Sequence, residues 1–291
     1  MSWNGTLTAD SAEGSEITHA PSGVSSGQYE IVPFTAPKGG VYRFTLLGSG
    51  GNTHGTEGSR SPGGTGGLTV GYRLMQAGET VYIGAGGPRC AAFVSQAAGA
   101  SLEGIGRANM LLMAGGGGEG GANWGQSYNL KSSAGGDGGG TTGGTAKSGG
   151  NGTPGTGGGQ SGAIGNMAGN GGVYNNEDDT SFWGGAGGDG YYGGKNGTGS
   201  SGGGGGSGYP GTEQVTVNGV TYTGSTTRGG GASSDANGSA RVAFIAPDTI
   251  PVVFNGTRLT ALYLNGVKVT SLIVDGVRLY MRKWRRKMCL A

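Results

Sequence analysis

The sequence predicts an all-β protein: an antiparallel β sandwich that carries a glycine-rich insertion and is followed by a C-terminal β meander. Short apolar stretches separated by turn residues predict the sandwich. Glycine supplies 74 of the 291 residues and concentrates between two of those stretches. Asn-Gly and Asp-Gly pairs recur near the C-terminus. We therefore divide the chain into an N-terminal arm (1–28), a sandwich (29–247) with its insertion (about 114–211), and a C-terminal module (248–291).

The composition allows a folded chain with a small hydrophobic core. Charged residues make up 12% of the chain and hydrophobic residues 33%, and the net charge is +2. Disordered chains usually combine low hydrophobicity with high net charge, and only the first property is present here. The start lacks the basic and apolar regions of a secretory signal, and no apolar run approaches the length of a membrane span. We expect a protein that is made in the cytoplasm and does not insert into a membrane.

The arm is polar and rich in small residues, and the strand pattern begins directly after it. Apolar residues then gather in six short stretches: 29–34, 41–47, 68–74, 80–83, 110–113 and 241–245. A turn at Pro37–Gly40 lies between the first and second stretches, and a turn at Gln76–Gly78 lies between the third and fourth. Short strands joined by turns favour an antiparallel sandwich over a parallel sheet.

The glycine tracts lie between the last two stretches, so they form an insertion and not a tail. Their spacing is irregular, which excludes a collagen triple helix, because collagen needs glycine at every third position. Glycine chains in the polyproline-II conformation leave every N–H and C=O free to bond laterally. Each bond nets about 0.5–1.5 kcal/mol against about 1–2 kcal/mol per ordered residue, so such a bundle needs anchored ends. We predict a polyglycine-II bundle anchored by the sandwich.

Aromatic residues interrupt the glycine tracts at apparent turns. They are Trp124, Tyr128, Tyr174, Phe182, Trp183, Tyr191 and Tyr192. One interpretation is that they cover the flanks of the bundle and supply its core. The other is that they form a binding surface, because aromatic rings give large contact area at low entropic cost and Gly, Ser and Asn give adaptable polar contacts. These seven residues are the candidate receptor-binding loops.

The C-terminal module contains a repeat with a period of ten residues. Asn255-Gly256, Asn265-Gly266 and Asp275-Gly276 each stand between apolar residues, which is the strongest short hairpin signal. A small meander of this kind cannot bury itself alone and implies docking or oligomerisation. A basic tail follows, with candidate assembly residues Arg282, Lys283, Trp284, Arg285, Arg286 and Lys287. The tail could contact phosphates or an anionic surface, or serve only as a solvated terminus.

No motif predicts catalysis, a cofactor or a metal centre. Matches to G-x-G-x-x-G are expected by chance in so glycine-rich a chain, and none has the strand-to-helix context of a nucleotide site. His19 and His54 are isolated in the sequence. The acidic stretch 175–179 lacks the spaced pattern of a calcium loop, and a solvated turn is the favoured interpretation over calcium binding. We expect a protein that is not an enzyme and whose main role is not nucleic-acid binding.

Several stretches resemble known glycine-rich families. "FTAPKGGVYRFTLLGSGG", "AGETVYIGAGG", "NMLLMAGGGGEGG" and "SGGGGGSGYPG" are similar to the glycine-rich domain beside a jelly-roll sandwich in anaplastic-lymphoma-kinase-type receptors. They equally resemble glycine-rich proteins of phage tails, and "LYLNGVKVTSLIVDGVRLY" is similar to β modules of phage virion proteins. Together these resemblances cover about residues 29–281. The chain lacks a kinase, so the phage family is the better match.

The phage resemblance implies a virion protein, a tail fibre or adhesin, whose distal polyglycine-II loops bind the bacterial surface. The implied partners are a glycan or an outer-membrane protein of the host, other virion proteins, and further copies of the chain, with a trimer favoured. One departure is that the adhesins of this family carry no comparable C-terminal meander. The alternative is a capsid or tail decoration protein that binds no receptor. Ice binding by a flat glycine face is weaker still, because it expects a regular triplet repeat.

Overall fold

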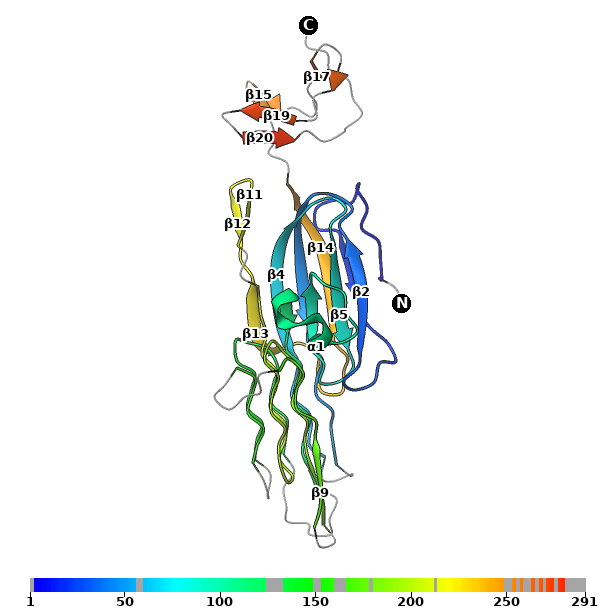
Figure 1. Cartoon of the computed structure of the whole chain (residues 1–291), viewed down its shortest axis with the longest axis vertical. Helices are drawn as coiled ribbons and strands as arrows, with labels where there is room; N and C mark the ends of the chain where they lie inside the picture. The colour runs from blue at the N-terminus through cyan, green and yellow to red at the C-terminus, as the bar shows by residue number, and fades with distance from the viewer. Residues whose placement is uncertain are drawn as a thin grey trace.

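The structure is a computed structural model, and nearly all of its regular elements are β-strands (Figure 1). It describes residues 3–55, 60–123, 133–148, 153–159, 166–177, 180–211 and 214–248, together with the strand residues 253–254, 257–258, 263–264, 267–268, 271–274 and 277–280. The prediction of an all-β chain is confirmed. Within these residues, no helix has the length and apolar character needed to cross a membrane.

Two antiparallel sheets form what we call the β body. The first has the order β1-β14-β3-β4-β13, with strands Glu16–His19, Ser239–Pro247, Gly40–Leu47, Gly67–Met75 and Ser225–Gly230. The second has the order β2-β5-β6-β7, with strands Tyr29–Thr35, Thr80–Gly86, Ala92–Ser95 and Met110–Ala114. The short helix α1 (Leu102–Ile105) and the 3-10 turn η1 (Arg107–Asn109) connect β6 to β7. All six strands expected from apolar stretches are present.

The hydrophobic core lies between these two sheets. In β3, Tyr42, Phe44 and Leu46 are fully buried and alternate with residues that keep partial exposure, because successive side chains of a strand point to opposite faces. Phe34 of β2 meets Tyr42 and Phe44 edge-on at ring-centroid distances of 5.5 and 6.3 Å. The core therefore joins the first sheet to the second through aromatic contacts.

The N-terminal segment contributes to the β body, although the sequence predicts a separate arm. Residues Glu16–His19 form the edge strand β1, which pairs with β14 in antiparallel register. Trp3 and Leu7 pack against the core cluster, and the Trp3 ring lies 6.0 Å from that of Phe34. The sequence does not predict this strand, because its four residues include only one aliphatic side chain, Ile17, and so show no alternating apolar pattern.

The C-terminal hairpins are present but do not join into one meander. β15 and β16 (Val253–Phe254, Thr257–Arg258), β17 and β18 (Tyr263–Leu264, Val267–Lys268), and β19 and β20 (Ser271–Val274, Val277–Tyr280) form three separate two-stranded sheets. In each, the strands flank one of the predicted Asn-Gly or Asp-Gly pairs. A further hairpin, β11 and β12 (Val215–Val217, Val220–Tyr222), stands beside β4 and is absent from the sequence-based prediction.

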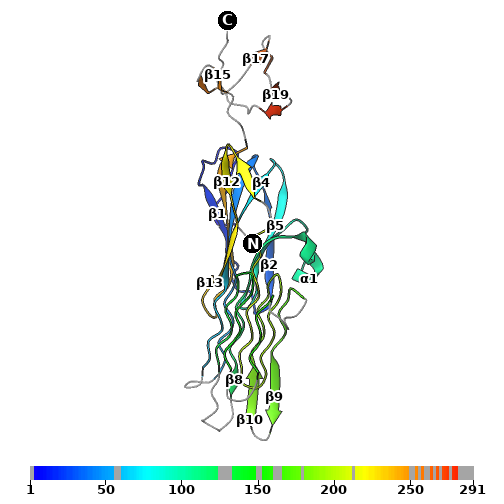
Figure 2. The ribbon, with the colours of Figure 1, turned by 90° about the vertical axis from the view of Figure 1, so that its left-hand side faces the viewer.

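Extended glycine-rich segments run away from the β body side by side, and we call them the glycine lattice (Figure 2). They are residues 48–52, 61–67, 115–121, 133–139, 143–148, 153–158, 166–170, 184–190, 193–198 and 200–208. Three strands lie at the end of the lattice far from the β body: β8 (Ala122–Asn123), β9 (Val173–Glu177) and β10 (Thr180–Gly184). Segments before β7 also contribute, so the lattice is wider than the predicted insertion.

Backbone hydrogen bonds of the lattice repeat every third residue. In segment 115–121, the N–H groups of Gly116 and Glu119 donate to segment 184–190, those of 117 and 120 to segment 48–52, and those of 118 and 121 to segment 133–139. The carbonyls of the same segment accept from still other neighbours, as when Gly203 donates to Glu119. Each segment thus bonds in several directions around its axis, which a flat sheet does not allow.

The lattice needs glycine because its segments approach too closely for a side chain. A Cβ at Gly118 would lie 2.0 Å from the carbonyl oxygen of Gly203, and one at Gly203 would lie 2.0 Å from that of Ala186. Segments 115–121, 184–190 and 201–208 are buried along their whole length. Buried backbone polar groups must be hydrogen-bonded, and here other backbones supply the partners.

Candidate functional site

The lattice separates the predicted aromatic residues into two groups at its opposite ends. Phe182 and Trp183 lie in β10 at the far end (Figure 2), whereas Tyr191 and Tyr192 lie against Arg107 of η1, next to the β body. Tyr174 belongs to β9, where its backbone is in register with that of Trp183. Trp124 and Tyr128 lie outside the described residues, as do the tail residues Arg282, Lys283, Trp284, Arg285, Arg286 and Lys287.

At the far end, Trp183 is part of a small polar cluster. Its ring lies 5.5 Å from that of His54, and its indole Nε1 is buried without a hydrogen-bond partner among the described residues. His54 Nε2 lies 3.3 Å from the Glu119 carboxylate. Phe182 is buried at 7% exposure, so only Trp183 of this pair can present part of its surface to a ligand.

Glu119 joins the far-end cluster to the interior of the lattice. Its carboxylate accepts hydrogen bonds from the Asn52 amide at 2.9 Å and from the backbone N–H of Ala186 at 3.3 Å. Burial acts to raise the pKa of Glu119, but the hydrogen bond and charge of His54, together with Asn52, outweigh it and lower the pKa. The carboxylate is therefore held in its charged form and connects three segments.

At the near end, Tyr191 and Tyr192 form an aromatic cluster with Tyr209 and Arg107. Tyr191 stacks on Tyr209 with ring centroids 4.3 Å apart, and the Arg107 guanidinium lies 4.3 Å from the Tyr192 ring centroid. Arg107 Nε also donates to the Tyr191 carbonyl at 2.8 Å. Tyr192 remains 38% exposed. These contacts attach the lattice turn to η1, so Tyr191 has a structural role whatever else it does.

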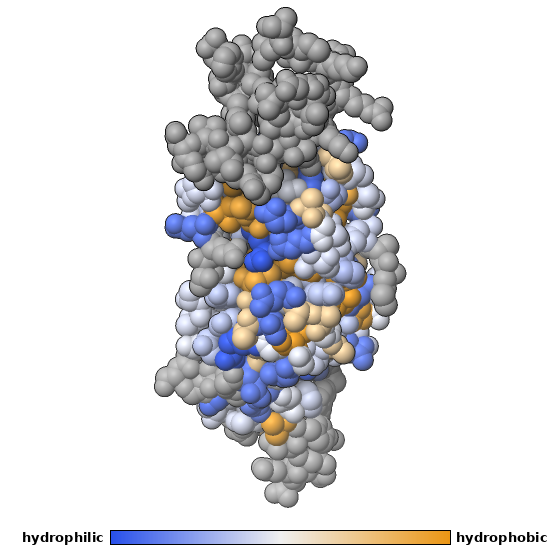
Figure 3. All heavy atoms as spheres, turned by 45° about the horizontal axis from the view of Figure 1, so that its top comes forward, coloured by the Kyte–Doolittle hydropathy of each residue, from blue (hydrophilic) through white to orange (hydrophobic). Residues whose placement is uncertain are grey.

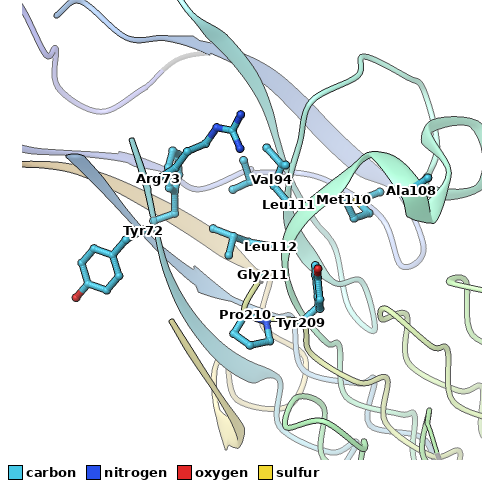
Figure 4. Close-up of a pocket in the computed structure, with 11 residues that line it drawn as sticks. Tyr72, Arg73, Val94, Ala108, Met110, Leu111, Leu112, Tyr209, Pro210 and Gly211 are labelled. Atoms are coloured by element: carbon cyan, nitrogen blue, oxygen red, sulfur yellow. The ribbon is translucent and has the colours of Figure 1, made fainter. Parts of the chain in front are cut away.

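Tyr209 also lines a groove of about 210 Å³ between β4 and β7 (Figure 4). Leu111, Leu112, Val94 and Pro210 give the groove an apolar surface, and the Arg73 side chain lies at one end. Arg73 pairs with Glu79 at 3.1 Å, so its charge is compensated. The groove can bind apolar groups.

The surface beyond these sites is mixed in character. Figure 3 shows hydrophobic residues in small groups between hydrophilic ones on the visible face. The most exposed large hydrophobic residues of the described chain are Val220 at 51%, Leu74 at 40% and Tyr192. No cluster of three or more potential metal-ligating side chains exists among the described residues, and the candidate calcium stretch 175–179 is only partly described.

Sequence reasoning missed the buried charges that connect the lattice to the β body. Asp189, 3% exposed, accepts from the Tyr29 hydroxyl at 2.5 Å and pairs with Arg89 at 3.3 Å. A signal existed in the sequence, because Glu119 and Asp189 are isolated acidic residues within otherwise uncharged glycine runs.

No family model and no curated protein sequence matches this chain.

Proposed function

We propose that the glycine lattice is a polyglycine-II bundle and that the β body is a jelly-roll-like sandwich. The polyproline-II conformation has three residues per turn, which fits the repeat of lattice hydrogen bonds at every third residue. A shared core between two antiparallel sheets supports the sandwich. Both assignments give the chain a stiff frame that carries the strands β8, β9 and β10 at one end.

The function that this frame supports best is attachment of a phage particle to a bacterial surface, as a non-enzymatic virion fibre or adhesin. The observation that carries the proposal is the lattice itself, in which buried backbone bonds hold the strands β8, β9 and β10 of the far end away from the β body (Figure 2). Recognition residues commonly lie on loops that a rigid scaffold positions. Trp183 and its neighbours at the far end are the proposed contact with a host glycan or outer-membrane protein.

The C-terminal module fits a role in assembly. Two-stranded hairpins are marginally stable in isolation, so the hairpins of residues 253–280 favour an assembled partner. We place there the contacts with other virion proteins or with further copies of the chain, and a homotrimer is the favoured state. Light scattering of the purified chain distinguishes a trimer from a monomer, and a monomer at all concentrations would exclude self-assembly through this module.

Binding of fluorescently labelled protein to a panel of bacterial strains tests the attachment role. We expect strain-selective binding that a Trp183→Ala variant loses. Tyr192→Ala is the matched control, because Tyr192 is an aromatic residue that lies against Arg107 beside the β body. Equal loss in both folded variants, or binding unaffected by Trp183→Ala, would contradict recognition at the far end.

A capsid or tail decoration protein without a receptor is the second candidate. The burial of Phe182 favours it, because a buried aromatic side chain supports the lattice and cannot contact a host. This alternative predicts that folded protein binds no strain of the panel but does bind particles assembled without it. That result would replace the attachment role with a purely structural one.

A further inference from the structure

A second cavity, of about 370 Å³, lies where the lattice meets the β body beside α1. Its walls come from four separate parts of the chain: residues 27–29 at the start of β2, Arg89 between β5 and β6, the residues around α1, and the lattice. The lining residues are Gly27, Gln28, Tyr29, Arg89, Ala100, Ser101, Leu102, Glu103, Ala168 and Asp189. Convergent polar groups in a cavity of this kind are the usual mark of a binding site.

Arg89 is the central polar group of this cavity, and its backbone is strained. Its φ is 63°, in the left-handed region that non-glycine residues rarely occupy. Hydrogen bonds hold it there, because its N–H donates to the Gly50 carbonyl at 2.7 Å and its carbonyl accepts from Asp189 at 2.8 Å. Strain that the surrounding structure maintains is often associated with a functional site.

Only part of the Arg89 guanidinium is used within the protein. Its Nη1 contacts Asp189 Oδ1 at 3.3 Å and the Gly187 carbonyl at 3.5 Å. In the described part of the chain, Nε and Nη2 have no hydrogen-bond partner, and the side chain keeps 22% exposure. A guanidinium has five N–H donors, so Arg89 can still donate to a ligand.

A carboxylate and an amide line the same cavity as these donors. Glu103 is exposed, and its Oε1 accepts from the backbone N–H groups of Met167 at 2.8 Å and Ala168 at 3.1 Å. This fixes the carboxylate at the cavity and leaves Oε2 for a ligand. Gln28, also exposed, lines the same cavity and has both a donor and an acceptor.

The charges of the lining select among ligand classes. An anionic ligand that pairs with Arg89 would face the carboxylates of Glu103 and Asp189, and a cationic ligand would face Arg89. A hydroxyl group both donates and accepts, so neighbouring hydroxyls can donate to Glu103 and accept from Arg89 at once. The lining therefore favours a neutral, hydroxyl-rich ligand.

From this geometry we infer that the cavity between α1 and the lattice binds a neutral sugar through Arg89, Glu103 and Gln28. The inference rests on the proposed attachment to bacterial surfaces and gives it a ligand class, a neutral glycan, at a site separate from the far end. Asp189 and Tyr29 position Arg89, since the hydroxyl of Tyr29 and the guanidinium of Arg89 both contact the Asp189 carboxylate.

Saturation-transfer NMR of the full-length protein with simple sugars tests this site. The neutral probes are the methyl glycosides of glucose, galactose and mannose, and N-acetylglucosamine, while glucuronate and glucosamine are the charged probes. We expect transfer to at least one neutral probe and weaker transfer to both charged ones. No transfer to any neutral probe, or stronger transfer to a charged probe, would overturn the inference.

Two variants locate the site without breaking the Arg89–Asp189 pair. Gln28→Ala and Glu103→Gln should each lower the binding affinity for the neutral probe by about tenfold, the effect of losing one good hydrogen bond. Glu103→Gln should also raise the affinity for glucuronate relative to that for the neutral probe, because the substitution removes a negative charge from the cavity. A purely structural role of Glu103 would not produce this change. Gln76→Ala and Glu13→Gln, at exposed positions elsewhere, are the matched controls.

Cell binding by the same proteins separates this inference from the proposed function. If wild-type protein and both cavity variants bind cells equally, and no neutral probe binds, then attachment stands and the sugar site is wrong. If a neutral probe binds at the cavity but no cell is bound, then the sugar site stands and attachment is wrong. Unchanged probe binding in both cavity variants also refutes the site.

Discussion

The β body and the glycine lattice order the same chain in opposite ways. In the β body, large side chains such as Phe44 and Tyr42 are removed from water, and backbone bonds lie within two antiparallel sheets. In the lattice, glycine is the commonest residue, and much of the buried surface is the backbone itself, bonded in several directions. Hydrophobic burial stabilises the first region, and hydrogen-bond satisfaction with close backbone contact stabilises the second.

The difference indicates that the two regions depend on each other unequally. A net gain of about 0.5–1.5 kcal/mol per hydrogen bond does not exceed an ordering cost of about 1–2 kcal/mol per residue. The lattice therefore needs its segment ends held in place, and the β body holds them. The β body depends less on the lattice, because its larger core cluster lies between its own sheets, and only a smaller second cluster includes a lattice side chain, Met167.

Removing a core side chain from the β body should have the largest effect on the whole molecule. Phe44 is fully buried, and Phe44→Ala should lower the free energy of unfolding by about 3–5 kcal/mol. Because the β body anchors the lattice, the lattice amides of residues 115–121 should lose hydrogen-exchange protection together with those of β3. Denaturant unfolding and hydrogen exchange measure the two effects.

The matched control for this change is Leu74→Ala on the neighbouring strand β4. Leu74 is 40% exposed, so its truncation should change stability far less. If the lattice amides of Phe44→Ala keep their hydrogen-exchange protection while those of β3 lose it, then the lattice is stable without its anchor.

Adding a methyl group inside the lattice should have a smaller and more local effect. The Cβ of Gly118→Ala would meet the Gly203 carbonyl oxygen at 2.0 Å, and overpacking of this kind costs about 1–3 kcal/mol. We expect faster amide exchange in segments 115–121 and 200–208 while β3 and β14 stay protected. The midpoint of β-body unfolding should change little.

Gly171→Ala provides the comparison at the same chemistry. A Cβ there would have no atom within 4 Å, so the added methyl group should leave lattice exchange unchanged. Equal exchange in Gly118→Ala and Gly171→Ala would contradict the close backbone contact on which the lattice depends.

Sequence patterns predicted those strands of the β body that have one buried and one exposed face better than strands that are fully buried or made of small, polar residues. Strands such as β3 show that alternation, and the Asn-Gly and Asp-Gly pairs correctly located the three C-terminal hairpins. β6 (Ala92–Ser95) escaped because all four of its residues are buried, which removes the alternating signal. β1 and β13 escaped because their small and polar residues resemble loops.

The candidate sites were harder to place, because position along a glycine tract does not tell which end of the lattice a turn occupies. Successive segments run in opposite directions, so one uncounted segment moves a turn to the other end. This is why Tyr191 and Tyr192, one glycine-rich segment after the β10 aromatics in sequence, lie next to Arg107 and not beside Trp183. The pairing of Asp189 with Arg89 joins residues far apart in sequence and follows no local pattern.

Acidification should change the stability of the protein least among these tests. It acts on the lattice through the buried carboxylate of Glu119. Glu119 is buried in the lattice, and its pKa lies below the ordinary value of 4.5 because His54 and Asn52 outweigh the effect of burial. A carboxyl group whose pKa is lower in the folded state adds stability above its unfolded pKa. That contribution is lost as the pH falls through the folded value. Asp189 acts in the opposite direction, because burial raises its pKa despite Arg89 and Tyr29.

Glu119→Gln tests this contribution by removing the titrating group. At neutral pH the variant should be less stable than the wild-type protein, because the charged hydrogen bonds to Asn52 and His54 are weakened. Below about pH 4.5 the difference should narrow, since the wild-type carboxylate becomes protonated and the variant has nothing further to lose. Unfolding curves from about pH 7 to about pH 3 measure this convergence, with the exposed Glu13→Gln as control. Curves that stay parallel would show that the charge of Glu119 does not stabilise the lattice and that its neutral hydrogen bonds alone suffice.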